Sequence, residues 1–352
     1  MSALVSLHPG DCLKVLDTFP DDHFDGVVTD PPYHLQSIVD RFGNPDAAPA
    51  RVGRDGGNAR ASQKFQGQTW DGGDISFRPE TWAKVLRVLK PGGYLAAFNH
   101  SRKFHRMAVA LEDAGLEFRE MLAWVYGSGL PQNHPVWRYL EKLGCSQEEI
   151  QTWEGWGTVL RPCLEPIALV RKPLSESSIA RQCLATGTGA INLAATAIPN
   201  LDKPRKSDLD PIPTRYPGNL LHDGSPEVLA RFPVADNGLS ASRFFYCAKA
   251  SKADRRGSEH PTVKPQALME WLIKLIVPAG ARILDPFGGS GSTGWAAANL
   301  GVHCDLIEQK PEYQADILRG ISDLQNQEDV PDVSDPAPHA LLGQASLFPP
   351  EN

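Results

Sequence analysis

Residues 283–294, ILDPFGGSGSTG, contain a short apolar strand, a glycine-rich turn and the first residues of a helix. This order lets backbone approach a nucleotide-like molecule, because glycines carry no side chain and the start of a helix presents free N–H groups. Gly289, Gly291 and Gly294 fit the Gly-x-Gly-x-x-Gly pattern of dinucleotide-binding proteins. Glu308 ends the next apolar run, where an acidic residue can bind ribose hydroxyls. The stretch therefore indicates a nucleotide-type cofactor on an α/β fold.

A second motif, Asp30-Pro31-Pro32-Tyr33 (the Asp30 motif), directly follows the apolar run at 24–29. The run predicts a buried strand, and the motif predicts a rigid polar turn at its end. The motif resembles the catalytic motif of amino-methyltransferases. This resemblance implies that the Asp30 carboxylate and the Pro31 carbonyl accept the two hydrogens of an exocyclic base amine, which makes that nitrogen more tetrahedral and more nucleophilic. Tyr33 can stack on the base. Because such an amine lies inside a duplex, the base would have to leave the stack, which costs roughly a few kcal/mol.

Apolar runs and helical patterns alternate near both ends of the chain, which predicts a doubly wound α/β fold with helices on both faces of a parallel sheet. Helices are expected at 12–19, 81–89, 102–114, 265–276, 290–300 and 311–321, and strands at 24–29, 94–98, 121–126, 282–284 and 302–307. We expect both chain ends to complete the sheet. Pro91-Gly92-Gly93 is expected to stop the helix that precedes it.

Four segments are predicted along the chain. Residues 1–126 form a catalytic half with a long loop at 36–73, 127–259 form a target-recognition region, 260–322 form a cofactor-binding half, and 323–352 form an acidic tail. The recognition region loses the alternating pattern and is punctuated by Pro, Gly and Trp. The tail is rich in Pro and poor in aromatics, so we expect it to be disordered.

The composition argues against a membrane or secreted protein. The sequence is 41% hydrophobic, contains no apolar run near 18 residues, and begins without a basic segment. A cytoplasmic protein is therefore expected. The six cysteines are scattered, without Cys-x-x-Cys or paired histidines, so neither disulfides nor a zinc site is predicted.

The net charge of −7 does not exclude a nucleic-acid partner. Residues 321–352 hold six acidic residues and no Lys or Arg, so the remainder carries about −1. Residues 243–264 carry six basic side chains against two acidic ones. This stretch is either a phosphate-contacting segment or a solvated loop.

The order of the motifs resembles that of a known family. The Asp30 motif comes first, the irregular region follows, and the glycine turn comes last. From residue 7 to about 320, the chain resembles the β group of amino-specific DNA methyltransferases, especially orphan adenine-specific enzymes of prophages. Other segments that carry the resemblance are Trp70-Asp71-Gly72-Gly73, Val88-Leu89-Lys90-Pro91-Gly92-Gly93, Trp124-Val125-Tyr126-Gly127-Ser128-Gly129, Leu164-Glu165-Pro166-Ile167, Leu221-His222-Asp223-Gly224-Ser225 and His260-Pro261-Thr262-Val263-Lys264-Pro265.

The resemblance implies a Rossmann-like, circularly permuted methyltransferase fold with an inserted recognition domain, S-adenosylmethionine as cofactor and no metal. It implies catalytic roles for Asp30, Pro31, Pro32 and Tyr33. The cofactor-binding positions that it implies are Asp11, Cys12, Asp30, Thr262, Lys264, Asp285, Pro286, Phe287, Gly288, Gly289, Ser290, Gly291, Ser292, Thr293 and Glu308. Among these, Asp11 would face the cofactor adenine and Glu308 its ribose. Lys264 would meet the methionine carboxylate or, alternatively, a phosphate.

The implied reaction is methyl transfer to N6 of a flipped-out adenine in double-stranded DNA by direct in-line attack. Asp30 favours adenine because Ser at this position would favour cytosine N4, and cytosine N4 stays an alternative. A hydride-transferring enzyme fits the glycine pattern alone but lacks a substrate-binding half and a proton relay. A catalytically silent DNA-binding regulator is the alternative from another class.

Several partners and contacts are also predicted. Basic residues that could contact phosphates or guanine edges are Arg161, Arg171, Lys172, Arg181, Arg243, Lys249 and Lys252. The family resemblance implies a homodimer that addresses both strands of a palindromic site. Residues 344–348, QASLF, resemble peptides that dock into the bacterial sliding clamp. The expected location is the cytoplasm, associated with the nucleoid.

Overall fold

The computed structural model describes residues 4–34, 73–127, 135–200, 212–234, 238, 240–247, 254 and 263–328. The predicted loop at 36–73, apart from Gly73, lies outside the described residues. So do Thr262, the clamp-like peptide at 344–348 and the tail beyond Glu328.

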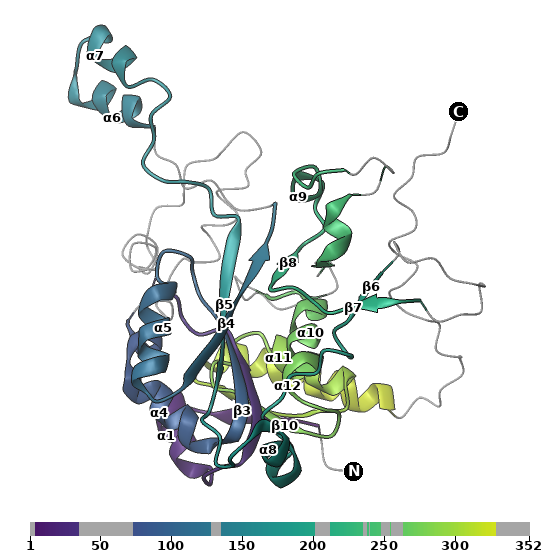
Figure 1. The fold of residues 1–352 in the computed structure, drawn as a ribbon. Coiled ribbons are helices and arrows are strands. Elements are labelled where there is room, and N and C mark those ends of the chain that lie inside the picture. Colours follow the sequence, from purple (N-terminus) through teal and green to yellow (C-terminus); the bar gives the residue numbers. More distant parts are fainter. Residues whose placement is uncertain are drawn as a thin grey trace.

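A nine-stranded sheet forms the centre of the molecule (Figure 1). Its strands, in spatial order, are β1 (Val5–Pro9), β11 (His303–Glu308), β10 (Arg282–Asp285), β2 (Phe24–Thr29), β3 (Leu89–Phe98), β5 (Leu164–Arg171), β4 (Glu117–Val125), β8 (Leu220–His222) and β9 (Tyr246–Cys247). Strand β5 runs antiparallel to both β3 and β4, whereas the other neighbouring pairs are parallel. The pairing of β1 with β11 confirms that both ends of the chain complete the sheet. A separate two-stranded sheet contains β6 (Ile198–Pro199) and β7 (Thr214–Arg215).

Helices cover both faces of this sheet, which confirms the doubly wound α/β prediction (Figure 1). Successive strand residues point to opposite faces, so Val27 joins one apolar cluster and Val28 joins the other. The first cluster takes side chains from α4 (Pro79–Val88) and α5 (Phe104–Asp113). The second takes them from α10 (Gln266–Ile276), α11 (Ser292–Asn299) and α12 (Pro311–Glu328). Shorter helices are α1 (Cys12–Val15), η1 (Leu16–Thr18), η2 (Ile75–Phe77), α6 (Val136–Leu143), α7 (Gln147–Thr152), α8 (Ile179–Thr186), α9 (Pro226–Leu229) and η3 (Ala241–Phe244).

The junction between α4 and β3 differs from the prediction. Pro91-Gly92-Gly93 was expected to end the helix, but α4 ends at Val88 and β3 already begins at Leu89. Leu89 is fully buried and pairs with Phe24, after which the register shifts and pairing resumes at Gly26 with Tyr94. Gly92 has φ +78°, so Pro91-Gly92-Gly93 forms an irregularity between the two paired parts of β3 and does not serve as the helix stop.

Strand β5 comes from inside the range 127–259 predicted for target recognition, yet it is a central strand of the main sheet. The alternation of strands and helices did not reveal it, because β5 is reached without a preceding crossover helix and runs in the opposite direction. Helices α6 and α7 precede it and project away from the sheet (Figure 1). None of the helices among the described residues is long and apolar enough to cross a membrane.

Candidate functional site

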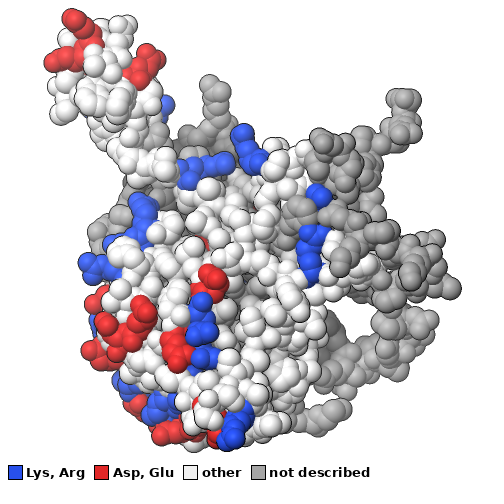
Figure 2. All heavy atoms as spheres, viewed as in Figure 1, with Lys and Arg blue, Asp and Glu red and all other residues white. Residues whose placement is uncertain are grey.

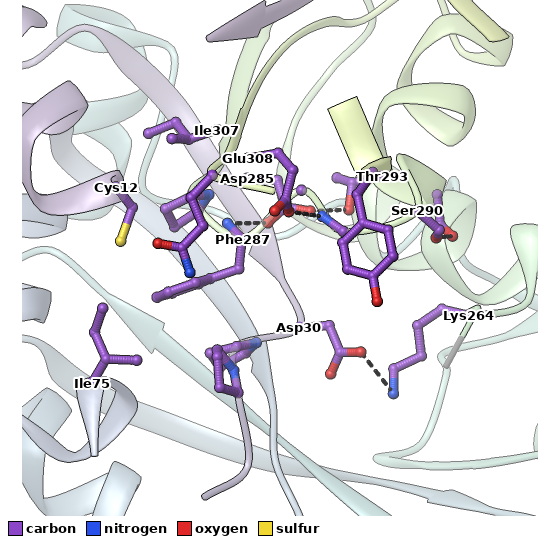
Figure 3. Close-up of a pocket in the computed structure, with 18 of the residues that line it drawn as sticks. Cys12, Asp30, Ile75, Lys264, Asp285, Phe287, Ser290, Thr293, Ile307 and Glu308 are labelled. Carbon is purple, nitrogen blue, oxygen red and sulfur yellow. Dashed lines mark hydrogen bonds and ion pairs between the residues drawn. The ribbon is translucent and has the colours of Figure 1, made fainter. Parts of the chain in front are cut away.

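A pocket of about 280 Å³ lies where β1, β2, β10 and β11 end (Figure 3). The carboxyl ends of neighbouring parallel strands meet at one edge of a sheet, so the residues that follow these strands gather there. The lining residues are Gly10, Asp11, Cys12, Asp30, Pro31, Pro32, Tyr33, Ile75, Lys264, Met269, Asp285, Pro286, Phe287, Gly288, Gly289, Ser290, Ser292, Thr293, Ile307, Glu308, Gln309 and Tyr313.

Asp285 links β10 to its neighbours at the floor of the pocket. One carboxylate oxygen accepts hydrogen bonds from the Thr29 hydroxyl at 2.6 Å and the Phe287 N–H at 3.0 Å, and the other accepts from the Thr293 hydroxyl at 2.6 Å. Burial raises the pKa of Asp285 to about 6, although these three hydrogen bonds lower it. The buried carboxylate thus fixes the ends of β2 and β10 against the start of α11.

Glu308, at the end of β11, faces the same pocket. Its two carboxylate oxygens each accept a backbone N–H, from Gly289 and from Lys310, both at 2.8 Å. Burial raises the pKa of Glu308, while these backbone hydrogen bonds act in the opposite direction. Because each carboxylate oxygen has two lone pairs, both oxygens can accept a further hydrogen bond from a ligand hydroxyl. The side chain is therefore suited to bind a pair of ribose hydroxyls.

The backbone of the glycine turn requires glycine for two different reasons. Gly291 has φ +83° at the N-cap of α11, a conformation that other residues adopt only with strain. Gly288 packs so closely on β11 that an added Cβ would lie 3.2 Å from the Ile307 carbonyl oxygen. Asp11, which follows β1 and lines the pocket, caps α1 by accepting the Leu13 N–H at 2.8 Å.

The Asp30 motif forms the opposite side of the pocket together with Lys264 (Figure 3). The Tyr33 hydroxyl lies 2.6 Å from Asp30 Oδ1 and 3.2 Å from Glu165 Oε2. The Lys264 ammonium lies 3.1 Å from Asp30 Oδ2, 2.9 Å from the Tyr33 hydroxyl oxygen and 2.7 Å from Glu165 Oε2. Ser76 donates to the Pro32 carbonyl at 2.8 Å and so holds the backbone of the motif.

The charges at this side fix the protonation of Lys264 and Tyr33. Burial by itself would lower the pKa of Lys264, but the charges of Asp30 and Glu165 outweigh it, so its pKa is higher than usual. Burial, followed by the same two carboxylates, holds the pKa of Tyr33 well above its usual range. Near neutral pH, Lys264 is therefore a cation and Tyr33 a neutral hydroxyl.

The structure brings most of the predicted site residues into one pocket. The four residues of the Asp30 motif line it, and so do the predicted cofactor positions Asp11, Cys12, Lys264, Asp285, Pro286, Phe287, Gly288, Gly289, Ser290, Ser292, Thr293 and Glu308. Gly291 caps α11 and does not line the pocket, and Thr262 lies outside the described residues.

Sequence reasoning missed several residues of the site. The lining residues without a predicted role are Gly10, Ile75, Met269, Ile307, Gln309 and Tyr313. Ile307 and Gln309 flank Glu308 and could have been inferred from it. Glu165 belongs to one of the segments that carry the family resemblance, but no role was predicted for it. Nothing in the neighbouring sequence indicates that the start of β5 lies beside the end of β2.

The predicted DNA-contacting residues have different surroundings. Arg171 is buried and donates to Glu117 at 2.6 Å, and Lys172 pairs with Asp22 at 2.7 Å. Both side chains are thus held within the fold. Arg161 and Arg181 are exposed, Arg243 donates to the Ser240 carbonyl at 2.7 Å, and Lys249 and Lys252 lie outside the described residues.

The described part of the chain holds no group of three or more His, Cys, Asp or Glu placed to bind a metal ion. The six cysteines are free thiols, and only Cys12 and Cys304 are buried. Burial raises the pKa of Cys12, which lines the pocket, to about 12, so this thiol is a poor nucleophile near neutral pH.

The doubly wound sheet with one reversed strand, and the pocket at the ends of its parallel strands, define a Rossmann-like methyltransferase fold. The sequence comparison is more specific. The chain belongs to the DNA methylase family, whose model matches residues 24–319.

Two curated relatives are type II methyltransferases. M.HindIII of Haemophilus influenzae is 28% identical over 227 residues, which cover 64% of this chain and 62% of the relative. M2.DpnII of Streptococcus pneumoniae is 42% identical over 62 residues, or 18% of this chain and 23% of the relative. The chain thus spans less than two thirds of the length of either relative. Among solved structures, the cytosine-N4-specific PvuII DNA methyltransferase is 17% identical with a TM-score of 0.49, and the match covers 92% of each chain.

Proposed function

We propose that this protein is an S-adenosylmethionine-dependent DNA methyltransferase that modifies N6 of adenine. One observation carries the proposal: a single pocket holds both the Asp30 motif and the Glu308 side of the glycine turn. A base amine bound at Asp30 and a methyl donor bound at Glu308 would therefore meet in the same cavity. The membership of the DNA methylase family supports the same reaction.

The chemistry of the pocket fits the proposed cofactor. Glu308 offers acceptors for ribose hydroxyls, and the side chains of Phe287 and Ile307 offer an apolar surface for an adenine ring. Asp11, Asp30, Asp285 and Glu308 line the pocket together with a single lysine, Lys264. This excess of carboxyl groups favours a cationic ligand. When bound, S-adenosylmethionine supplies an electrophilic methyl group on a positively charged sulfur.

The residues of the Asp30 motif would prepare the amine for attack. The Asp30 carboxylate accepts one amine hydrogen and the Pro31 carbonyl accepts the other, so that the nitrogen lone pair is freed from the ring. Pro31 and Pro32 restrict the backbone, and Ser76 holds the Pro32 carbonyl, so these acceptors are fixed before the base arrives. The ring of Tyr33 supplies a surface on which the base can stack.

The order of the elements supports a finer classification. The strand that carries the Asp30 motif, β2, lies directly beside β10 in the sheet, although the glycine turn that follows β10 comes more than 250 residues later in the chain. We therefore propose that the chain belongs to the permuted β group. The resemblance of its sequence extends this proposal to an orphan enzyme of the prophage type. Residues 1–126 and 260–322 would form the catalytic body together with β5, and the rest of 127–259 would read the DNA.

The surface charge suggests where DNA would not bind. The projecting α6–α7 unit shows acidic side chains on its surface (Figure 2), and its segment contains Glu141, Glu148, Glu149 and Glu154 against Arg138 and Lys142. Phosphates would be repelled there. The exposed Arg161 and Arg181 are better candidates for phosphate contacts.

Three further predictions come from the sequence alone. They are a homodimer, the docking of residues 344–348 to the sliding clamp, and association with the nucleoid.

The proposed function is tested by incubating purified protein with unmethylated genomic DNA and S-adenosylmethionine. Nucleoside mass spectrometry and modification-sensitive sequencing then identify the product. N6-methyladenine in a defined sequence is the expected result. N4-methylcytosine would overturn the choice of base, and an unmodified product with intact cofactor binding would favour a catalytically silent DNA-binding regulator.

A further inference from the structure

Three segments far apart in the sequence bring one cation between two carboxylates. Asp30 follows β2, Glu165 lies at the start of β5, and Lys264 precedes α10. The lysine side chain is only 7% exposed, and the two carboxylate side chains are 20% and 18% exposed. The ammonium is closer to Glu165, at 2.7 Å, than to Asp30, at 3.1 Å.

This arrangement engages both oxygens of the carboxylate that the proposed reaction requires. Asp30 Oδ1 lies 2.6 Å from the Tyr33 hydroxyl, and Asp30 Oδ2 faces the Lys264 ammonium. Each oxygen keeps one lone pair, but a base amine that approaches Asp30 competes with both of these partners for the carboxylate. Displacing the ammonium would be costly if Asp30 were its only anionic partner, because a buried charge without a partner is strongly unfavourable.

We propose that Glu165 is a positioning residue that holds the Lys264 ammonium while Asp30 accepts the target amine. The inference rests on the proposed function. Glu165 lets Lys264 withdraw from Asp30 without losing its neutralising charge, so the exchange of partners takes place inside the buried cluster. Glu165 acts through Lys264 and does not contact the reacting atoms.

If Glu165 holds Lys264 in this way, Glu165→Gln should slow methyl transfer. Glutamine preserves the shape of the side chain and an acceptor for Tyr33, but it leaves Asp30 as the only carboxylate beside Lys264. The ammonium then pairs more tightly with Asp30 and competes with the amine. We expect the single-turnover rate of methyl transfer to fall about 10- to 100-fold, which is the effect of about one hydrogen bond to a charged group. The cofactor Kd should change less than about threefold.

A double-mutant cycle tests whether Glu165 acts through Lys264. In a Lys264→Met background, where no ammonium competes, adding Glu165→Gln should change the rate less than about threefold, and the double variant should be faster than Glu165→Gln alone. The double variant removes one charge of each sign, so the net charge of the pocket is preserved.

The fluorescence of 2-aminopurine at the target position of the DNA gives a second readout, which reports base flipping and needs no cofactor. Glu165→Gln should lower this fluorescence.

Glu117→Gln is the matched control for folding. Glu117 lies at the other end of the β4–β5 ladder, where it pairs with the buried Arg171 at 2.6 Å. The Glu117→Gln variant should leave the rate of methyl transfer unchanged. Thermal unfolding should show that all of the variants fold.

The outcomes separate the two proposals. If wild type methylates DNA and Glu165→Gln is equally fast, or slows the Lys264→Met background as much as wild type, the role of Glu165 is wrong while the proposed function stands. If wild type modifies no base, both are wrong.

Discussion

The two sides of the pocket are built from different interactions. On the glycine-turn side, Asp285 and Glu308 accept hydrogen bonds from hydroxyls and backbone N–H groups. On the other side, Asp30 and Glu165 share the cationic Lys264. Backbone donors stay where the fold places them, whereas an ammonium can change partners. The first side is therefore suited to hold a ligand, and the second is suited to rearrange during a reaction.

Replacing Asp30 tests this division most severely. Asp30→Ala removes an acceptor of the amine but leaves Lys264 paired with Glu165, so the fold should persist. We expect turnover to fall about 10³-fold or more, with the cofactor Kd changed only a few-fold. Single-turnover kinetics and calorimetry measure the two effects. Asp21→Ala, which removes a surface carboxylate near β2, is the control, and retained turnover in Asp30→Ala would refute the assigned role.

Glu308→Gln should have the converse effect. The amide nitrogen would face a backbone N–H of Gly289 or Lys310, so one hydrogen bond of the turn becomes a repulsion. Cofactor affinity should fall about 10- to 100-fold, which corresponds to about 1–3 kcal/mol, with DNA binding unchanged. Calorimetric titration measures the Kd. Glu312→Gln on the exposed surface of α12 is the control, and an unchanged Kd in Glu308→Gln would show that the carboxylate does not contact the cofactor.

The pH dependence of stability tests the glycine-turn side alone. Burial raises the pKa of Asp285 to about 6, above its ordinary value, so the folded state binds the proton more tightly than the unfolded state. The contribution of Asp285 to the free energy of unfolding is therefore present at low pH and is lost as the pH rises from about 4 to about 6. Asp285→Asn should remove this dependence. The difference in unfolding free energy between wild type and variant should therefore change by about 1–3 kcal/mol across that range. Urea unfolding at several pH values measures it, and parallel curves would contradict the assignment.

A pair of glycine substitutions separates backbone strain from crowding. Gly291 and Gly144 both have positive φ, +83° and +76°, but only at Gly291 would a Cβ meet a neighbour, the Trp295 ring at 3.0 Å. Gly144→Ala should cost about 1 kcal/mol of stability and Gly291→Ala about 1 kcal/mol more. Chemical denaturation measures both. Equal costs would mean that the Trp295 ring moves aside, and the turn is then less rigid than its hydrogen bonds suggest.

The sequence predicted those parts of the site that depend on local order. The strand at 24–29 and the polar turn after it were located from adjacent residues, and so was the glycine turn after β10. The structure brings the two motifs together because β2 and β10 are parallel neighbours that share a carboxyl edge. Lys264 was expected to meet a carboxylate of the cofactor, and the structure pairs it with Asp30 and Glu165.

Glu165 could not be predicted in the same way. Its position depends on β5 running antiparallel between β3 and β4, which brings the start of that strand to the edge where its neighbours end. Local propensity does not specify the direction of an isolated apolar run. The direction is set by packing against residues far away in the chain, such as the pairing of Ile167 with Phe98.

The reversed strand also gives the molecule a modular character. Val125 and Leu164 face each other in the β4–β5 ladder, so the chain leaves the sheet and returns to it at neighbouring positions. The segment between these two strands, which includes α6 and α7, is therefore an excursion from the sheet. Its two ends are held together by the pairing of β4 with β5. Such an excursion can be shortened, extended or exchanged between relatives while the sheet and its pocket stay intact. A change of length in this excursion would thus leave the two sides of the pocket in register.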